Sequence, residues 1–158
     1  MTPVWTANRT WTDGEIVTAA MMNQYLRDNL DYLFGRPLLD VSDLDGTVSA
    51  TSSTSFTDIT GASGNITSSK GRVLLLANLV VSGNGANISA YTFSVAGSDV
   101  GNANYGCGYL QMTTTANPIS IMHVATITPD TLTAIKLRHR VSGGTSTVTL
   151  FNLKAYEL

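Results

Sequence analysis

Charged side chains are scarce in this chain: only 13% of its 158 residues are Asp, Glu, Lys or Arg. That is about half the usual share of a soluble domain. The formal net charge is −2, so there is no electrostatic reason to expect nucleic acid or an anionic membrane as a partner. We therefore predict no nucleic-acid binding.

Cysteine and long apolar runs are also nearly absent. Cys107 is the one cysteine, so no internal disulfide can form, and we interpret it as a small buried hydrophobe because no basic cluster lies near it. The longest apolar run, from Val73 to Ala77, is far shorter than the roughly 18 residues of a membrane-spanning helix. The N-terminus lacks the basic and then apolar pattern of a signal peptide. We expect neither membrane insertion nor secretion by that route.

The sequence also lacks the patterns of catalytic and metal sites. His123 and His139 interrupt apolar strand faces without ligand-forming neighbours, which predicts hydrogen-bonded histidines in a core or interface. The acidic residues Asp40, Asp43 and Asp45 partly match a calcium loop but lack its spaced Glu, so a turn explains them better. No nucleophile elbow is present. We expect no enzyme activity, no catalytic residue, no metal and no cofactor.

The N-terminal region, residues 1–37, contains a pattern that predicts an α-helix. Thr18 is a good N-cap, which predicts a helix that starts at the following residue. An alternative start at Thr12 would also be capped. Gly35 and then Pro37 end the pattern, because glycine permits a left-handed C-terminal residue and proline cannot continue a helix.

Two packings of this helix fit its apolar residues. A short coiled coil would have a seam of Ala19, Met22, Leu26, Asn29 and Leu33, with Asn29 as its polar core position. A helix docked on a sheet would instead use the stripe Met22, Leu26, Leu30 and Leu33. In either case so short a helix must pack on another element to be stable.

The segment before the helix is rich in aromatic residues. Trp5 and Trp11 lie in a stretch with little polarity, which is typical of an arm that docks on a partner subunit. The alternative is that both side chains fold back on their own domain. The candidate anchoring and partner-binding residues are therefore Trp5, Trp11, Met22, Leu26, Asn29 and Leu33.

Residues 38–158 read as a second region made of strands alone. The candidate strands are Ser55–Thr60, Arg72–Ser82, Ile88–Val95, Tyr109–Thr115, Ile119–Thr128, Leu132–Val141 and Thr147–Tyr156. Turn signals, among them residues 61–64 and 117–118, separate them. No helical pattern intervenes, so the strands should be antiparallel. We predict a mainly β protein: an antiparallel β-sandwich of the jelly-roll type with a short N-terminal arm and one α-helix.

Two of these strands are apolar on both faces. Leu74 and Leu76 alternate with inward residues of one strand, and Met122 and Val124 do so in another. In an antiparallel sandwich, each strand should have one solvent-exposed face. These four residues therefore predict either a subunit interface, at the axis of a trimer, or a place in the core between the sheets. The first interpretation favours an oligomer.

Both ends of the chain resemble known virion proteins. The N-terminal pattern consists of Trp11, Gly14, Val17-Thr18-Ala19, Asn23, Leu26-Arg27-Asp28-Asn29 and Leu33. It resembles the start of many small virion proteins of tailed bacteriophages. The C-terminal stretches 141–145 and 153–158 look like the last strands of trimeric jelly-roll heads of phages, which resemble tumour necrosis factor domains. The resemblance implies a homotrimer on a virion, assembled in the host cytoplasm and attached to other virion proteins by its N-terminal segment.

Three functions fit these observations. The first is a trimeric surface appendage of the tail-fibre or head-fibre type, with a host-surface receptor or glycan as a further partner. The second is a capsid decoration protein that cements neighbouring capsomers. The third is a carbohydrate-binding jelly roll in which Tyr91, Tyr105 and Tyr109 stack on sugars.

Overall fold

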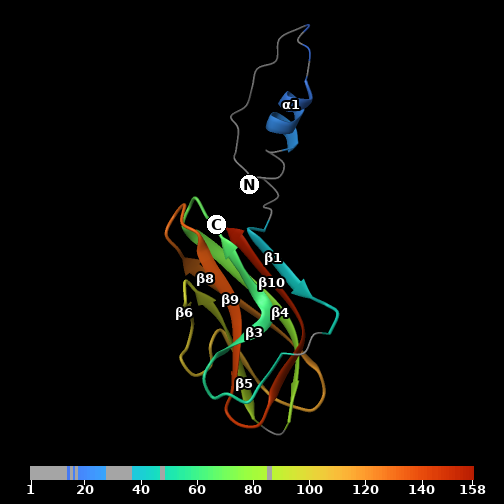
Figure 1. Cartoon of the computed structure of the whole chain (residues 1–158), viewed down its shortest axis with the longest axis vertical. Coiled ribbons are helices and arrows are strands. Elements are labelled where there is room, and N and C mark those ends of the chain that lie inside the picture. Colours follow the sequence, from blue (N-terminus) through green and yellow to red (C-terminus); the bar gives the residue numbers. More distant parts are fainter. Residues whose placement is uncertain (1–13, 15, 17, 28–36, 47–48, 85–86) are drawn as a thin grey trace. The chain divides into compact units, whose positions relative to one another are not determined.

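The computed structural model describes the chain as two compact units, Met1–Arg36 and Pro37–Leu158 (Figure 1). The residues that it describes are 14, 16, 18–27, 37–46, 49–84 and 87–158.

The described residues of the first unit form one short helix. An α-helical turn, α1 (Ala19–Met22), continues into a π-helical segment, η1 (Asn23–Arg27). The Thr18 hydroxyl accepts a hydrogen bond from the Met21 amide (3.3 Å), and the Met21 sulfur accepts one from the Thr18 amide (3.4 Å). The predicted start after Thr18 is confirmed. The wider π turn was not predicted, and the predicted end at Gly35 falls outside the described residues.

The second unit, the head, consists of two antiparallel sheets. Its strands are β1 (Leu39–Asp43), β2 (Ser49–Thr51), β3 (Thr57–Ile66), β4 (Arg72–Gly83), β5 (Ile88–Val95), β6 (Ser98–Asp99), β7 (Gly108–Gln111), β8 (Asn117–Thr126), β9 (Thr133–Val141) and β10 (Ser146–Glu157). Sheet A has the order β1-β10-β4-β8, and β2 also pairs with β10. Sheet B has the order β3-β9-β5-β6, and β7 also pairs with β5.

The order of the strands is that of a jelly roll. Along the chain, the long strands β3, β4, β5, β8, β9 and β10 belong in turn to sheets B, A, B, A, B and A. Successive long strands therefore cross between the layers, while the short strands β6 and β7 pair with β5 within sheet B. Figure 1 shows the resulting two-layered head. The predicted fold class, an antiparallel β-sandwich of jelly-roll type with one short helix, is confirmed.

The structure corrects three local predictions. Residues 61–64, read as a turn, lie inside β3, where the register with β9 shifts between Asp58 and Ser63. The acidic run begins in β1 instead of a turn. Pro118, also read as a turn residue, pairs with Val80 within β8, which is an edge strand of sheet A. Proline is tolerated there because an edge strand has a row of amides with no partner strand.

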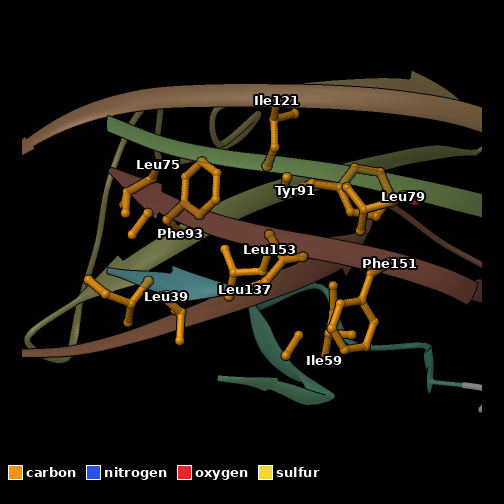
Figure 2. Close-up of a cluster of buried hydrophobic side chains, with 14 of the residues drawn as sticks. Leu39, Ile59, Leu75, Leu79, Tyr91, Phe93, Ile121, Leu137, Phe151 and Leu153 are labelled. Carbon is orange, nitrogen blue, oxygen red and sulfur yellow. The ribbon is translucent and has the colours of Figure 1, made fainter. Parts of the chain in front are cut away.

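The two sheets enclose one apolar core. Alternate residues of β4 and β10, such as Leu75 and Leu153, point to the same interior as Phe93 of β5 and Leu137 of β9, and all four are fully buried. Figure 2 shows these side chains gathered between the sheets, with Leu39 of β1 at one side. The core thus fixes the inner faces, and any interaction site must lie on the outer faces, the edges or the loops.

Candidate functional site

The outer face of sheet A carries a contiguous apolar surface. Leu74 pairs directly with Val124, and Leu76 with Met122, so the four side chains are cross-strand neighbours on β4 and β8. In the isolated chain Met122 is 67% exposed and Val124 is 46% exposed, while both leucines are half-buried. We call these four residues the apolar block. Of the two places predicted for them, the structure gives the outer face and not the core between the sheets.

Polar groups border the apolar block on two sides. On β10, Lys154 lies opposite Leu76, and its Nζ is 3.2 Å from Oδ2 of Asp40 on β1. Farther along β4 and β8, the Ser120 hydroxyl donates to Oδ1 of Asn78 at 2.6 Å. An apolar centre with a polar rim is the usual composition of a protein interface.

A groove of about 250 Å³ continues the same face of sheet A beyond Asn78 and Ser120. Its lining comes from the middle of the sheet and the end of β1: Leu44, Asn78, Leu79, Val80, Pro118, Ile119, Ser120, Leu150, Phe151 and Asn152. Leu44, which is 70% exposed, lies at its edge. Sequence reasoning missed this groove because it interpreted residues 40–46 as a turn, so the position of Leu44 directly after a strand was known only from the structure.

The outer face of sheet B is charged instead of apolar. Lys136 Nζ lies 2.6 Å from Oδ2 of Asp58, and Arg138 Nη1 lies 2.6 Å from Oδ1 of Asp99. Arg138 Nε is 2.9 Å from Asp58, but its N–H is not directed at an acceptor, so that contact is ionic. The hydrogen bond from Lys136, together with its charge and that of Arg138, holds the pKa of Asp58 below its usual value despite an opposing effect of burial.

The three tyrosines predicted to stack on sugars do not lie together. Tyr91 is fully buried in the core, where its hydroxyl lies 3.3 Å from that of Ser146, so its predicted role in binding is wrong. Burial raises the pKa of Tyr91. Tyr105 and Tyr109, by contrast, are 45% and 59% exposed and form a pair with ring centroids 4.8 Å apart.

The two histidines differ in their surroundings. His139 is 1% exposed on the inner face of β9, with its ring centroid 6.5 Å from that of Tyr91. Burial lowers the pKa of His139 to about 4. Its Nδ1 has no hydrogen-bond partner in the described part of the chain, so the predicted hydrogen bond is wrong for this atom. His123 is half-buried on β8 opposite Leu75.

The predicted anchoring residues are only partly visible. Met22 and Leu26 are 45% and 49% exposed within the first unit, so both are available to a partner. Trp5, Trp11, Asn29 and Leu33 lie outside the described residues.

The described residues show neither a metal-binding cluster nor a membrane-spanning helix. Over residues 18–27, 37–46, 49–84 and 87–158, and at residues 14 and 16, no three His, Cys, Asp or Glu side chains form a group that could hold a metal ion. Within the same residues, no helix is long and apolar enough to cross a membrane.

Comparisons with known proteins give little beyond this geometry. No protein-family model and no curated protein matches the chain. Among solved structures, the chain is similar to Eiger TNF from S. frugiperda, with 13% sequence identity and a TM-score of 0.42. The alignment covers 78% of this chain and 94% of that chain. The jelly-roll assignment rests on the strand order described above.

Proposed function

We propose that this chain is a structural virion protein of a tailed bacteriophage. In this role it forms a homotrimeric surface appendage of the tail-fibre or head-fibre type, assembled in the host cytoplasm, that performs no catalysis. The observation that carries the proposal is the apolar block on the outer face of sheet A. The class of protein comes from the sequence resemblance at the two ends of the chain.

The apolar block supports self-association on physical grounds. In an interface, the exposed side chains of Met122 and Val124 would be removed from water. Their burial would stabilise the complex by roughly 25 cal/mol per Å² of apolar surface. Leu74 and Leu76 lie beside them and extend the contact. In a closed ring of three copies, the apolar blocks would face the common axis and each copy would contact two neighbours.

The first unit supports a separate role in attachment. It is a compact unit distinct from the head, and its Met22 and Leu26 are exposed. A partner among the other virion proteins, of the tail or of the capsid, would cover these side chains. The head is then free to associate through sheet A while the N-terminal segment binds the particle.

The mass of the purified chain in solution tests the oligomer. We expect light scattering to give the mass of a trimer for the full chain and for residues 37–158. The shorter chain should fold, because it keeps the hydrogen bond from the Leu38 amide to the Ala155 carbonyl (2.6 Å). Met122→Asp should give a monomer, because a charge would be buried in the interface. Leu132→Asp is the matched control: Leu132 is 70% exposed but lies outside the apolar block. A monomeric wild-type chain at all concentrations would contradict the proposal.

Attachment is tested with particles. Removing residues 1–36 should leave a folded head that no longer co-purifies with virions, and retained attachment would disprove the anchoring role. Measurements on virions also distinguish the two candidate functions, a surface appendage and a capsid decoration protein. High copy number, together with heat-labile capsids when the protein is absent, would assign the chain to capsid decoration instead.

A further inference from the structure

An exposed aromatic pair marks the outer side of sheet B. Tyr105 and Tyr109 approach each other with ring centroids 4.8 Å apart and an angle of 43° between the planes. Both are about half exposed, although large aromatic side chains are on average well buried. Two rings kept together at the surface provide a platform for a ligand that has apolar faces.

Hydrogen bonds hold the loop that carries Tyr105. The Asn102 side chain accepts from the amides of Asn104 (2.8 Å) and Tyr105 (3.1 Å). Asn102 and Gly106 also exchange two backbone hydrogen bonds, at 2.9 and 2.7 Å. Gly106 has φ +62°, and a Cβ at this position would collide with the Tyr91 carbonyl. A loop held in this way loses little conformational freedom when a ligand binds.

Arg140 lies on the same outer face as Tyr109. Tyr109 pairs with Ala90 of β5, and Ala90 pairs with Arg140 of β9, so the three residues form one row across sheet B. Two inter-strand spacings separate the ends of the row by about 10 Å, which a di- or trisaccharide can span. The Arg140 guanidinium also donates to the Ala103 carbonyl (3.3 Å), in the loop that carries Tyr105.

Arg140 differs from the other cations of β9. Lys136 and Arg138 each pair with an aspartate, whereas no acidic partner of Arg140 occurs among the described residues. Its guanidinium instead lies 5.7 Å from the centroid of the Phe56 ring. Because this guanidinium has no acidic partner among the described residues, it keeps N–H groups available to donate two parallel hydrogen bonds to a carboxylate.

We propose that Tyr105, Tyr109 and Arg140 form a binding site for an oligosaccharide that carries carboxylate groups. The tyrosine rings stack on the apolar C–H faces of the sugar rings, and Arg140 binds the carboxylate. Gln111, exposed and two residues beyond Tyr109 on β7, offers an amide to sugar hydroxyls. The site lies on the sheet opposite the apolar block, so it stands independently of the proposed trimer.

Calorimetric titration of the full chain with a short oligogalacturonate and with a sialylated oligosaccharide tests the site. The methyl ester of the oligogalacturonate serves as the uncharged counterpart. Tyr109→Ala should weaken binding about tenfold, while Tyr109→Phe retains it because the ring remains. Arg140→Gln should weaken binding of the carboxylated probe about tenfold and leave the ester unchanged. Arg72→Gln, an exposed arginine on β4 of sheet A, is the matched control and should have no effect.

The outcomes are separable. Saturable binding of either carboxylated probe with these variant effects supports the site, and the tighter of the two identifies the class of sugar. Absence of saturable binding to both probes, equal binding of acid and ester, or equal effects of Arg140→Gln and Arg72→Gln would overturn it. Met122→Asp should bind with unchanged affinity per chain, so a failure of the trimer is not mistaken for a failure of this site.

Discussion

The outer faces of the two sheets differ although the strands beneath them are built alike. On sheet B, the outward residues of β9 are charged, and Lys136 and Arg138 are paired with Asp58 and Asp99. On sheet A, the outward residues at the centre of β4 are apolar and meet the equally apolar Met122 and Val124 of β8. The first face is compatible with water in a single chain. The second face leaves Met122 and Val124 67% and 46% exposed in the isolated chain.

The inner faces show no such difference. Leu75 of β4 and Leu137 of β9 are both fully buried, and each strand alternates between inner and outer positions with the same period. The two sheets are therefore alike in the interior that they share, and they differ in their outer rows. Substitutions on the inner and outer faces distinguish the two sheets.

Leu75→Ala and Leu76→Ala compare the two faces of one strand. Leu75 is fully buried and Leu76 half-buried. We expect Leu75→Ala to lower the free energy of unfolding by about 3–4 kcal/mol, because it leaves a cavity, and Leu76→Ala to lower it by about 1 kcal/mol or less. Denaturant unfolding of both variants in the Met122→Asp background, which we expect to be monomeric, measures the two losses within the single chain. Similar losses would show that the apolar block belongs to the core of the single chain.

Lowering the pH should reduce the free energy of unfolding through His139, which lies on the inner face of β9. The pKa of His139 is about 4 in the folded chain and about 6.5 in the unfolded chain, so its contribution to stability is complete above pH 6.5. As the pH falls from 6.5 to 4, the unfolded state binds the extra proton, and the chain loses about 3 kcal/mol. Unfolding midpoints measured across this range test the loss.

His139→Leu should remove most of this pH dependence, since leucine fills a similar space without titrating. An unchanged slope between pH 4.5 and 6.5 in that variant would mean that another group is responsible. The stabilisation that the Asp58 and Glu157 carboxylates contribute is lost only at lower pH than this range, because the pKa values of both groups are lowered in the folded chain.

The inner faces could be predicted from the sequence, because burial enforces strict alternation. The strands predicted at residues 72–82, 88–95 and 132–141 lie within one residue of the observed strands at each end. β1 was missed because Asp40 and Asp43 interrupt its pattern, although Leu39 packs into the core. The glycines inside β3 were read as a turn because a bulge and a turn use the same residue types.

The outer faces could be predicted only in part. Alternation identified the apolar block, but not which of its two possible places it occupies. The pairing of Tyr105 with Tyr109, and their common face with Arg140, depend on a loop closed by Asn102 and on the register across β5. Local sequence patterns do not encode such long-range register, so this site required the structure.

Glu157, at the end of β10, accepts hydrogen bonds from the segment that connects β3 of sheet B to β4 of sheet A. Its Oε1 accepts from the Ser68 hydroxyl (2.7 Å), the Ser69 hydroxyl (3.0 Å) and the Lys70 amide (3.0 Å). Burial raises the pKa of Glu157, but these hydrogen bonds outweigh that effect and hold the pKa below its usual value. Glu157→Ala should cost about 1–2 kcal/mol in denaturant unfolding, because buried Ser68 loses its acceptor.

Glu157→Gln is the control for that variant, because the amide oxygen can still accept. It should lose less stability than Glu157→Ala at neutral pH. The carboxylate's contribution is present above pH 4.5 and is lost as the pH falls through the lower pKa of the folded chain, so wild type and Glu157→Gln should converge in acid. A constant difference at every pH would exclude the charge as the cause.

The smallest effect is expected on the charged face itself. Asp58→Asn removes the partner of Lys136 and weakens that of Arg138, but the Asp58 side chain is 49% exposed, so water screens the pairs. We expect a loss of about 0.5–1 kcal/mol that shrinks as salt is added, and no change of mass in solution. Met122→Asp on the other sheet should change the mass instead. If Asp58→Asn also altered the oligomer, both outer faces would be interfaces, and the contrast between the two sheets would not hold.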